Sequence, residues 1–324
     1  MLKKVSIREV QDEMLRLLKI VDRICIDNGI EYWLDHGTLL GSIRQESFIP
    51  WDDDLDICLM HKDYIKLLSY LQEEADNNKN IFLLFNSNKG VNQYWCEYLC
   101  STKYVFGYSG KNVTPVRIDI FPMKSISPSD KYKDKSINSI AQYFCRGDKK
   151  GLRGLDKKYI KKEISEALAE KKSFMSYYNK SYMSSCNKTQ LDSLVTYSYG
   201  DSINKGLDYF RYSDIFPLSK VKFEDGIFFA PRNYKKYLTM IYGAYTKLPP
   251  FSERNPERTH FYYCTSVEFT RQKSIDYIQD LNSMFFYRDS FRQKSKILLF
   301  ILKNKGIISL IRRVFKKLEC IRKI

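Results

Sequence analysis

The sequence predicts an α+β fold in which a mixed β-sheet is flanked by helices. Two observations carry this prediction. Apolar residues recur every three or four positions over residues 7–26 and again over residues 62–76, which is the period of an amphipathic helix. Apolar and polar residues alternate over residues 54–59 and 117–121, which is the period of a strand.

The elements follow one another with short connections. Gly29 ends the first helix, and a short strand at residues 32–34 leads into a glycine-containing turn, His36-Gly37-Thr38, and then into a helix. Several strands are expected between residues 81 and 121. Residues 220–229 predict a β-hairpin, because Asp225-Gly226 readily takes the positive φ that such turns need. Pro231 is expected to start a helix that ends at Gly243.

We expect four segments. Residues 1–124 form a catalytic core, residues 125–215 a Lys-rich helical insertion, and residues 216–291 the hairpin and helix that complete the core. Residues 292–324 form a basic amphipathic helix. The net charge of the chain is +16, and this last segment, with 11 basic residues and 1 acidic residue, contributes most of it.

Composition excludes several classes of protein. A hydrophobic content of 44% is too high for a disordered chain, and no apolar run approaches the roughly 18 residues needed to span a bilayer. The first residues contain no apolar segment typical of a secretory signal, so we expect a cytoplasmic protein with reduced cysteines. Because the excess positive charge is confined to one end, nucleic acid is not the expected partner.

An acidic strand is the strongest chemical signal. On a strand, residues i and i+2 share a face, so Asp54 and Asp56 would point together while Leu55 and Ile57 enter the core. Two carboxylates on one face predict a site for Mg²⁺ or Mn²⁺. Asp52 with Asp54 is the alternative register. Asp119, in the second alternating strand, would supply a third carboxylate if the two strands are neighbours.

A phosphate site is predicted upstream of this strand. The turn at Gly37 and Thr38 leads to a helix N-terminus, whose backbone N–H groups and dipole attract anions, and Arg44 adds positive charge. His36 is expected to be a packing or capping residue. His260 lies after a proline-rich loop with Arg254 and Arg258 nearby, and an anion-binding role is the less favoured of its interpretations.

The order of these motifs, a glycine turn, an acidic strand and a distant strand with one aspartate, is typical of the nucleotidyltransferase fold. The chain also resembles the LicD/fukutin-related phosphotransferases. The residues that carry the resemblance are HGTLLGSIR (36–44), FIPWDDDLDI (48–57), RIDIFP (117–122), the segment from FPL (216–218) to Tyr242-Gly243, and LPP (248–250).

The resemblance implies a nucleotidyltransferase-like fold and a Mg-dependent transfer of phosphocholine or a phosphopolyol. The donor would be a CDP-linked molecule, and the acceptor a hydroxyl of a cell-surface glycan or a lipid-linked glycan. Asp54, Asp56 and Asp119 would hold the metal and carry catalysis, with Asp119 or Asp53 as general base. Trp51 would stack on the substrate, or serve as a core anchor.

Two alternatives stay open. One is a nucleotidyltransferase that releases pyrophosphate. The other is a non-catalytic protein that binds a membrane surface through residues 292–324. In that tail, Ile307, Ile311 and Val314 recur at helical spacing among basic residues, which suits an anionic leaflet and predicts a peripheral position on the inner face of the membrane. The same pattern also fits a helix that packs on the protein's own core.

Overall fold

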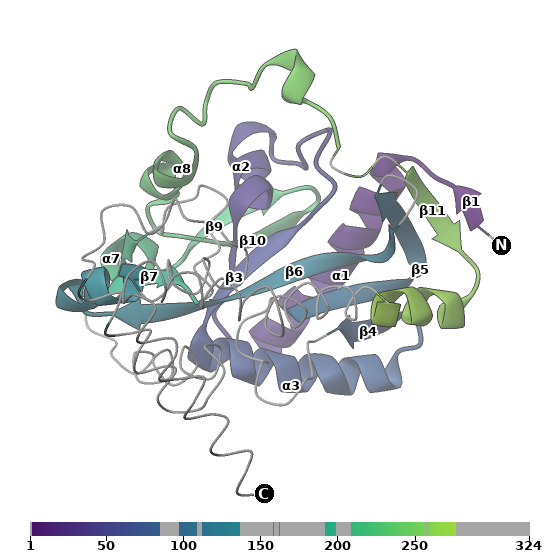
Figure 1. The fold of residues 1–324 in the computed structure, drawn as a ribbon, viewed down its shortest axis with the longest axis horizontal. Helices are drawn as coiled ribbons and strands as arrows, with labels where there is room; N and C mark the ends of the chain where they lie inside the picture. The colour runs from purple at the N-terminus through teal and green to yellow at the C-terminus, as the bar shows by residue number, and fades with distance from the viewer. Residues whose placement is uncertain are drawn as a thin grey trace, which may run out of the picture.

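A mixed sheet forms the centre of the molecule (Figure 1). The computed structural model describes residues 2–84, 97–108, 112–136, 158, 162, 192–198, 209–256, 258 and 260–276. Within these ranges the sheet has nine strands, with the main order β1-β11-β5-β6-β3-β2, and β4, β7 and β8 branching from it. The strands are β1 (Leu2–Lys4), β2 (Trp33–Leu34), β3 (Asp56–Met60), β4 (Ile81–Leu84), β5 (Glu97–Tyr108), β6 (Asn112–Ile126), β7 (Leu194–Tyr197), β8 (Phe210–Arg211) and β11 (His260–Cys264). Strands β3 and β6 run parallel and the other pairs antiparallel, which confirms the predicted mixed sheet.

Helices flank this sheet, as the sequence predicts. They are α1 (Ile7–Asn28), α2 (His36–Gln45), α3 (His61–Asn77), α7 (Tyr212–Ile215) and α8 (Tyr234–Tyr242), with short 3₁₀ turns η1 (Pro128–Asp130) and η3 (Phe251–Glu253). Helix α1 begins with a capping box between Ser6 and Glu9 and ends at Gly29, which adopts φ 61°. Helix α1 lies against β5 and β6, and α3 against β3, β4 and β6.

The alternation of residues in β3 and β6 separates the hydrophobic core from a polar face. Ile57 and Leu59 of β3, and Ile118 and Ile120 of β6, are fully buried. Asp56 and Asp119 stand at the intervening positions and so project to the opposite face of the same two strands. The core therefore fixes the register of both strands, because a slip of one residue would turn the carboxylates into the apolar core and turn the apolar side chains away from it.

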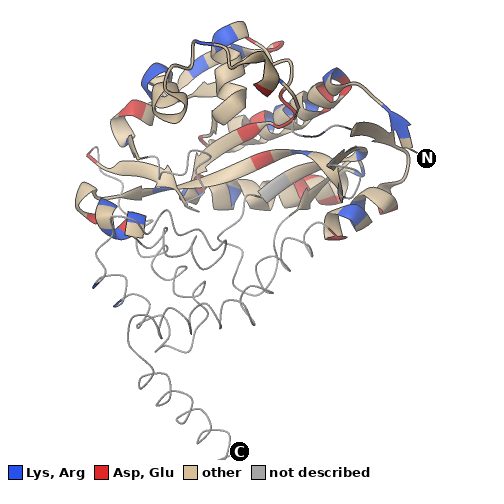
Figure 2. Ribbon diagram, turned by 45° about the horizontal axis from the view of Figure 1, so that its top comes forward, with Lys and Arg blue, Asp and Glu red and all other residues tan. Residues whose placement is uncertain are grey.

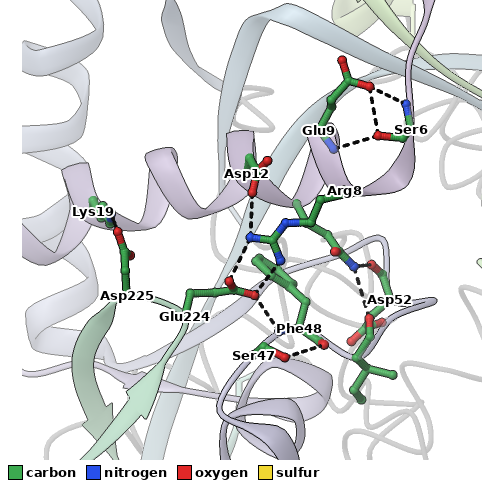
Figure 3. Close-up of polar contacts among 12 residues, drawn as sticks. Ser6, Arg8, Glu9, Asp12, Lys19, Ser47, Phe48, Asp52, Glu224 and Asp225 are labelled. Atoms are coloured by element: carbon green, nitrogen blue, oxygen red, sulfur yellow. Dashed lines mark hydrogen bonds and ion pairs between the residues drawn. The ribbon is translucent and has the colours of Figure 1, made fainter.

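A second, two-stranded sheet is the predicted hairpin of β9 (Ser219–Phe223) and β10 (Gly226–Ala230). The residue with positive φ in its turn is Glu224, at 54°, and this corrects the assignment of that conformation to Asp225-Gly226. Tertiary contacts stabilise this backbone: the Glu224 carboxylate accepts two hydrogen bonds of 2.8 Å from Arg8 and one of 3.1 Å from the Phe48 N–H (Figure 3). The hairpin tip is thereby tied to α1.

The same face of α1 holds the acidic loop. Gln11 Nε2 donates to the carbonyl oxygens of Ile49 and Asp52, at 3.2 Å and 2.8 Å. Figure 3 shows the hairpin tip and the loop that carries Asp52 on the same side of the helix. A long helix with a fixed cap thus orients the segment that leads into β3.

Three element boundaries differ from prediction. Strand β3 begins at Asp56, so Asp54 precedes it. Helix α2 already includes His36, and α8 begins at Tyr234, after an Asn233 cap that accepts a hydrogen bond from the Lys236 N–H, three residues beyond Pro231. Strand pairing with β6 sets the start of β3, and the Asn233 cap sets the start of α8.

The segment expected to be a helical insertion also contributes to the sheet. Strand β7 pairs antiparallel with β6, and β8 pairs with β7. The β-forming residues Val195, Thr196 and Tyr197 explain the strand, and all three are buried. Most of residues 137–191 and the whole basic tail, 292–324, lie outside the described residues, so the four-segment division stays a prediction.

Charges are mixed over the described surface. Lysine and arginine positions are interspersed with aspartate and glutamate positions along the described helices and strands (Figure 2). Among the described helices, none combines the length and the apolar character needed to cross a bilayer.

Candidate active site

Two carboxylates meet at the junction of β3 and β6. Asp56 is the first residue of β3, and Asp119 occupies the paired position on the parallel strand β6. The Asp119 N–H donates to the Leu55 carbonyl oxygen at 2.8 Å, which locks this register. The structure therefore brings Asp119 beside Asp56, as the alternating pattern predicts. Their roles in metal binding and catalysis stay predictions.

Electrostatic repulsion is concentrated at this junction. Burial raises the pKa of Asp56 well above its usual range, and the negative charges of Asp54, Asp119, Asp35 and Asp52 raise it further. Burial also raises the pKa of Asp119, and the charge of Asp54 contributes to the rise. The three predicted carboxylates are thus electrostatically coupled, even though Asp54 lies outside the strand.

Positive charge near Asp119 offsets only part of this repulsion. Arg117 Nε donates to Asp119 Oδ1 at 3.0 Å, and Arg117 and Arg258 both lower the pKa of Asp119. Among the described residues, the charges that act most strongly on the pKa of Asp56 are those of four carboxylates. A buried carboxylate without a cation is costly, so the site would gain from one more positive charge.

The donor set suits a hard divalent cation. Asp54, Asp56 and Asp119 offer carboxylate oxygens, which Mg²⁺ and Mn²⁺ prefer, and their mutual repulsion would be relieved by an ion. In the described part of the chain, no three His, Cys, Asp or Glu side chains already enclose a point where an ion would sit. Mg²⁺ commonly binds through one or two carboxylates and completes its shell with water and substrate phosphate, so the residues fit an ion of that kind.

Helix α2 holds Asp56 by its backbone. The Asp56 N–H donates to Thr38 Oγ1 at 3.0 Å, and the Asp56 carbonyl oxygen accepts from the Asp35 N–H at 3.0 Å. Thr38 is 1% exposed. The Thr38 hydroxyl, which is predicted to bind phosphate, therefore accepts a hydrogen bond that helps to position Asp56. The proton of that hydroxyl can still be donated.

A carboxylate approaches the start of α2 at Gly37. A Cβ atom placed on Gly37 would overlap Asp52 Oδ2 and would lie 3.3 Å from Asp52 Cγ. Only glycine allows this approach. The N-terminal turn of α2, where a donor phosphate was expected, thus has the Asp52 side chain beside it.

An arginine from the loop after α8 covers Trp51. The Arg254 guanidinium lies 5.7 Å from the centroid of the Trp51 ring, and Arg254 Nε donates to the Pro249 carbonyl oxygen at 2.9 Å. Partial burial lowers the pKa of Arg44, and the positive charge of Arg254 lowers it further. Trp51 and two arginines therefore form a cationic edge next to the acidic loop.

A family model matches one segment of the chain. Residues 29–150 match the model described as "LicD/FKTN/FKRP, nucleotidyltransferase domain". The chain carries a LicD-family domain. The matched segment contains all eight predicted site residues, from Gly37 to Asp119, and it excludes Arg254 and Arg258.

Three curated relatives are similar to parts of the chain, and one of them is a LicD protein. The chain is 27% identical over 269 residues to "Lipopolysaccharide cholinephosphotransferase LicD" of Haemophilus influenzae, covering 79% of this chain and 97% of the relative. It is 43% identical over 60 residues to an uncharacterized protein of Rickettsia prowazekii, covering 18% of this chain and 23% of the relative. It is 27% identical over 145 residues to "Mannosyltransferase regulator 4" of Saccharomyces cerevisiae, covering 42% of this chain and 12% of the relative.

Within the LicD domain, Asp53 is placed apart from the other predicted residues. Its side chain is 2% exposed and accepts a hydrogen bond from the Arg258 N–H at 2.8 Å, with the Arg258 guanidinium 3.5 Å from its other oxygen. Asp53 therefore ties the loop after α8 to the acidic segment.

The histidines occupy different environments. His36 is buried at the start of α2 with φ 40°, and its ring stacks on Tyr197 with centroids 5.4 Å apart. This geometry agrees with packing. The cap position itself belongs to Asp35, whose side chain makes no capping bond. His260 is exposed at the start of β11, opposite Gly107 of β5 and after the loop, as the sequence predicts.

One functional candidate was missed by sequence reasoning: the Asp35 side chain. It is fully buried and accepts hydrogen bonds from three donors, Tyr197, Tyr237 and Cys58. The sequence does hold a signal for it: Asp35 directly follows the apolar residues Trp33 and Leu34 of an expected strand, which is a position where burial is expected. Tyr197 and Tyr237 lie 162 and 202 residues after Asp35 in the sequence, so no local pattern reveals these contacts.

Proposed function

We propose that this chain is a phosphotransferase that moves phosphocholine, or a phosphopolyol, from a CDP-linked donor to a hydroxyl of a cell-surface glycan. The LicD-family domain and the similarity to a lipopolysaccharide cholinephosphotransferase over most of both chains support this activity. The parallel pairing of Asp56 with Asp119, next to Asp54, is the observation that carries the proposal at the level of chemistry. A nucleotidyltransferase-like core is part of the same proposal.

The proposed cofactor is Mg²⁺ or Mn²⁺, held by Asp54, Asp56 and Asp119. A divalent ion in such a site neutralises charge on the donor diphosphate and on the leaving nucleotide. Arg44, Gly37 and Thr38 would contact donor phosphate oxygens, and Trp51 would stack on the donor. Catalysis of this kind depends mainly on positioning and electrostatics.

Asp119 is the better of the two candidates for general base. Its side chain is 18% exposed, whereas that of Asp53 is 2% exposed and holds the Arg258 backbone. Asp53 stays the alternative. Measuring donor turnover by Asp119→Asn and by Asp53→Asn compares the two candidates.

The test is a donor screen with product identification. Purified protein would be incubated with Mg²⁺ and CDP-choline, CDP-ethanolamine, CDP-glycerol or CDP-ribitol, in the presence of a glycan acceptor. We expect CMP release with one donor, loss of release with EDTA, and at least about a hundredfold loss in Asp56→Asn. Asp76→Asn, at an exposed position of α3, is the matched control. Full turnover by folded Asp54→Ala and Asp56→Ala proteins would show that the site is elsewhere.

A nucleotidyltransferase is the second candidate, and the nucleotidyltransferase domain named in the family match favours it. In that reaction the acceptor attacks the α-phosphorus of a nucleoside triphosphate, and pyrophosphate leaves. Identifying the released product separates the two candidates, since the proposed phosphotransferase releases CMP.

We further propose a peripheral position on the inner face of the membrane, through the basic residues 292–324. Eleven basic residues and one acidic residue in this tail support attraction to anionic lipids. The fraction of the protein that sediments with anionic vesicles should fall strongly when residues 292–324 are deleted. Unchanged binding by the shortened chain would refute the role of the tail.

A further inference from the structure

A buried carboxylate joins three remote parts of the chain. Asp35, in the corner between β2 and α2, has 0% exposure. Its Oδ2 accepts from the Tyr197 hydroxyl at 2.6 Å and from the Cys58 thiol at 2.9 Å, and its Oδ1 accepts from the Tyr237 hydroxyl at 2.8 Å. The two tyrosine hydroxyls lie 3.2 Å apart. Strand β7 and helix α8 are thereby connected to the start of α2.

Asp35 is the acceptor in all three of these contacts. The hydroxyls of Tyr197 and Tyr237 and the thiol of Cys58 donate, and the two carboxylate oxygens of Asp35 share the three bonds. Burial raises the pKa of both tyrosines, and the charge of Asp35 raises it further, so these hydroxyls stay protonated.

The corner that Asp35 occupies also controls Asp56. The Asp35 N–H donates to the Asp56 carbonyl oxygen at 3.0 Å, and three residues later Thr38 Oγ1 accepts the Asp56 N–H at 3.0 Å. Both backbone polar groups of Asp56 are therefore held by residues 35–38. Cys58, two residues beyond Asp56 on the same face of β3, donates a hydrogen bond to the Asp35 carboxylate.

We propose that Asp35 is a positioning residue for Asp56: its hydrogen bonds to Tyr197 and Tyr237 fix the β2–α2 corner, and that corner sets the Asp56 carboxylate for the divalent cation. This inference rests on the proposed function, since it assigns Asp35 a role toward the same ion. Replacing a group that orients a metal ligand without touching the metal commonly lowers metal affinity by about 10- to 100-fold.

Single-atom substitutions separate positioning from folding. Tyr197→Phe and Tyr237→Phe each remove one hydroxyl and keep the ring, and Asp35→Asn removes the charge at constant shape. Tyr209→Phe is the matched control, because the buried Tyr209 hydroxyl donates to Asp134 at 2.9 Å in another part of the structure. It removes the same kind of bond without touching the Asp56 corner.

The readouts are Mn²⁺ affinity by titration calorimetry and thermal stability of the metal-free protein. We expect affinity to fall a few-fold in Tyr197→Phe and Tyr237→Phe and about tenfold in Asp35→Asn, and to stay at the wild-type value in Tyr209→Phe. Equal Mn²⁺ affinity in the wild type, Tyr197→Phe and Tyr237→Phe, with only the stability lowered, would overturn the proposal and leave Asp35 a structural residue. The two tyrosine variants decide the matter if Asp35→Asn fails to fold. A wild-type protein that binds no Mn²⁺ refutes the metal site itself, together with this inference.

Discussion

The close contact between α2 and the acidic loop makes Gly41 a sensitive position for stability. A Cβ atom on Gly41 would overlap the Ser47 carbonyl oxygen and lie 3.1 Å from the Ile49 backbone nitrogen. Carbon and carbonyl oxygen normally stay about 3.3–3.6 Å apart, so Gly41→Ala forces α2 and the loop apart by roughly 1 Å. The obstructing atoms belong to the backbone, and no rotamer change can remove them.

Two opposing terms set the magnitude. Overpacking of this kind costs about 1–3 kcal/mol. Alanine is a better helix former than glycine by about 0.5–1 kcal/mol, which offsets part of the cost. We therefore expect Gly41→Ala to lower the free energy of unfolding by about 1–2 kcal/mol. The loop carries Asp52 and Asp54, so turnover should fall as well.

Urea denaturation monitored by tryptophan fluorescence measures this effect. The midpoint of the transition should fall in Gly41→Ala at an unchanged slope, since the exposed area on unfolding hardly changes. Gly29→Ala is a useful comparison, because Gly29 has φ 61° with open space around its Cβ position, so that its cost comes from backbone strain alone. A Gly41→Ala protein as stable as the wild type, or more stable, would refute the reasoning from backbone contact.

Three further outcomes are expected. Gly37→Ala should leave stability near that of the wild type and lower donor turnover, because the added methyl displaces only the flexible Asp52 carboxylate; a large drop in the unfolding midpoint would contradict this. Asp56→Asn should raise the melting temperature at pH 7 in EDTA while abolishing turnover, because the raised pKa of Asp56 means that its ionised form destabilises the metal-free fold; the stability it contributes is present at low pH and is lost as pH rises through the folded-state pKa. The gain should shrink at acidic pH, and an Asn variant that is less stable at both pH values would argue against buried repulsion. Glu224→Gln should lower the melting temperature at pH 7, with the difference from the wild type closing as pH falls below the usual glutamate range. The hydrogen bond from Arg8 lowers the pKa of Glu224, so its contribution is present above the unfolded pKa and is lost on acidification, and an unchanged difference at low pH would contradict the ion pair.

Local patterns predicted much of the fold. The alternation in residues 54–59 and 117–121 identified β3 and the centre of β6, and the spacing of apolar residues identified α1 and α3. The patterns placed Asp56 and Asp119 on two strands, and the prediction that they lie together depended on those strands being neighbours; the pairing of β3 with β6 meets that condition.

Long-range contacts explain what the patterns missed. The positive φ at Glu224 depends on Arg8, which is 216 residues away in sequence, and the burial of Asp35 depends on Tyr197 and Tyr237. Strand β7 was missed because the surrounding lysine-rich sequence masked a run of only four strand residues. In each case the decisive partner is distant in sequence, and periodicity carries no information about it.

Two of the motif blocks that carry the resemblance are the two sides of one packed corner. Helix α2 contributes small residues and hydroxyls, and the segment that follows contributes backbone and carboxylates. Three contacts join one block to the other: Gly37 with Asp52, Thr38 with Asp56, and Gly41 with Ile49. Two more lie at the edge of the corner, Gly41 with Ser47 and Gln45 with Phe48. The segment between α2 and β3 is short, so the position of α2 limits where β3 can begin. The spacing between HGTLLGSIR and IPWDDDLDI is therefore a geometric requirement of the corner. A longer loop would leave the same residues in the chain but would release the backbone of Asp56.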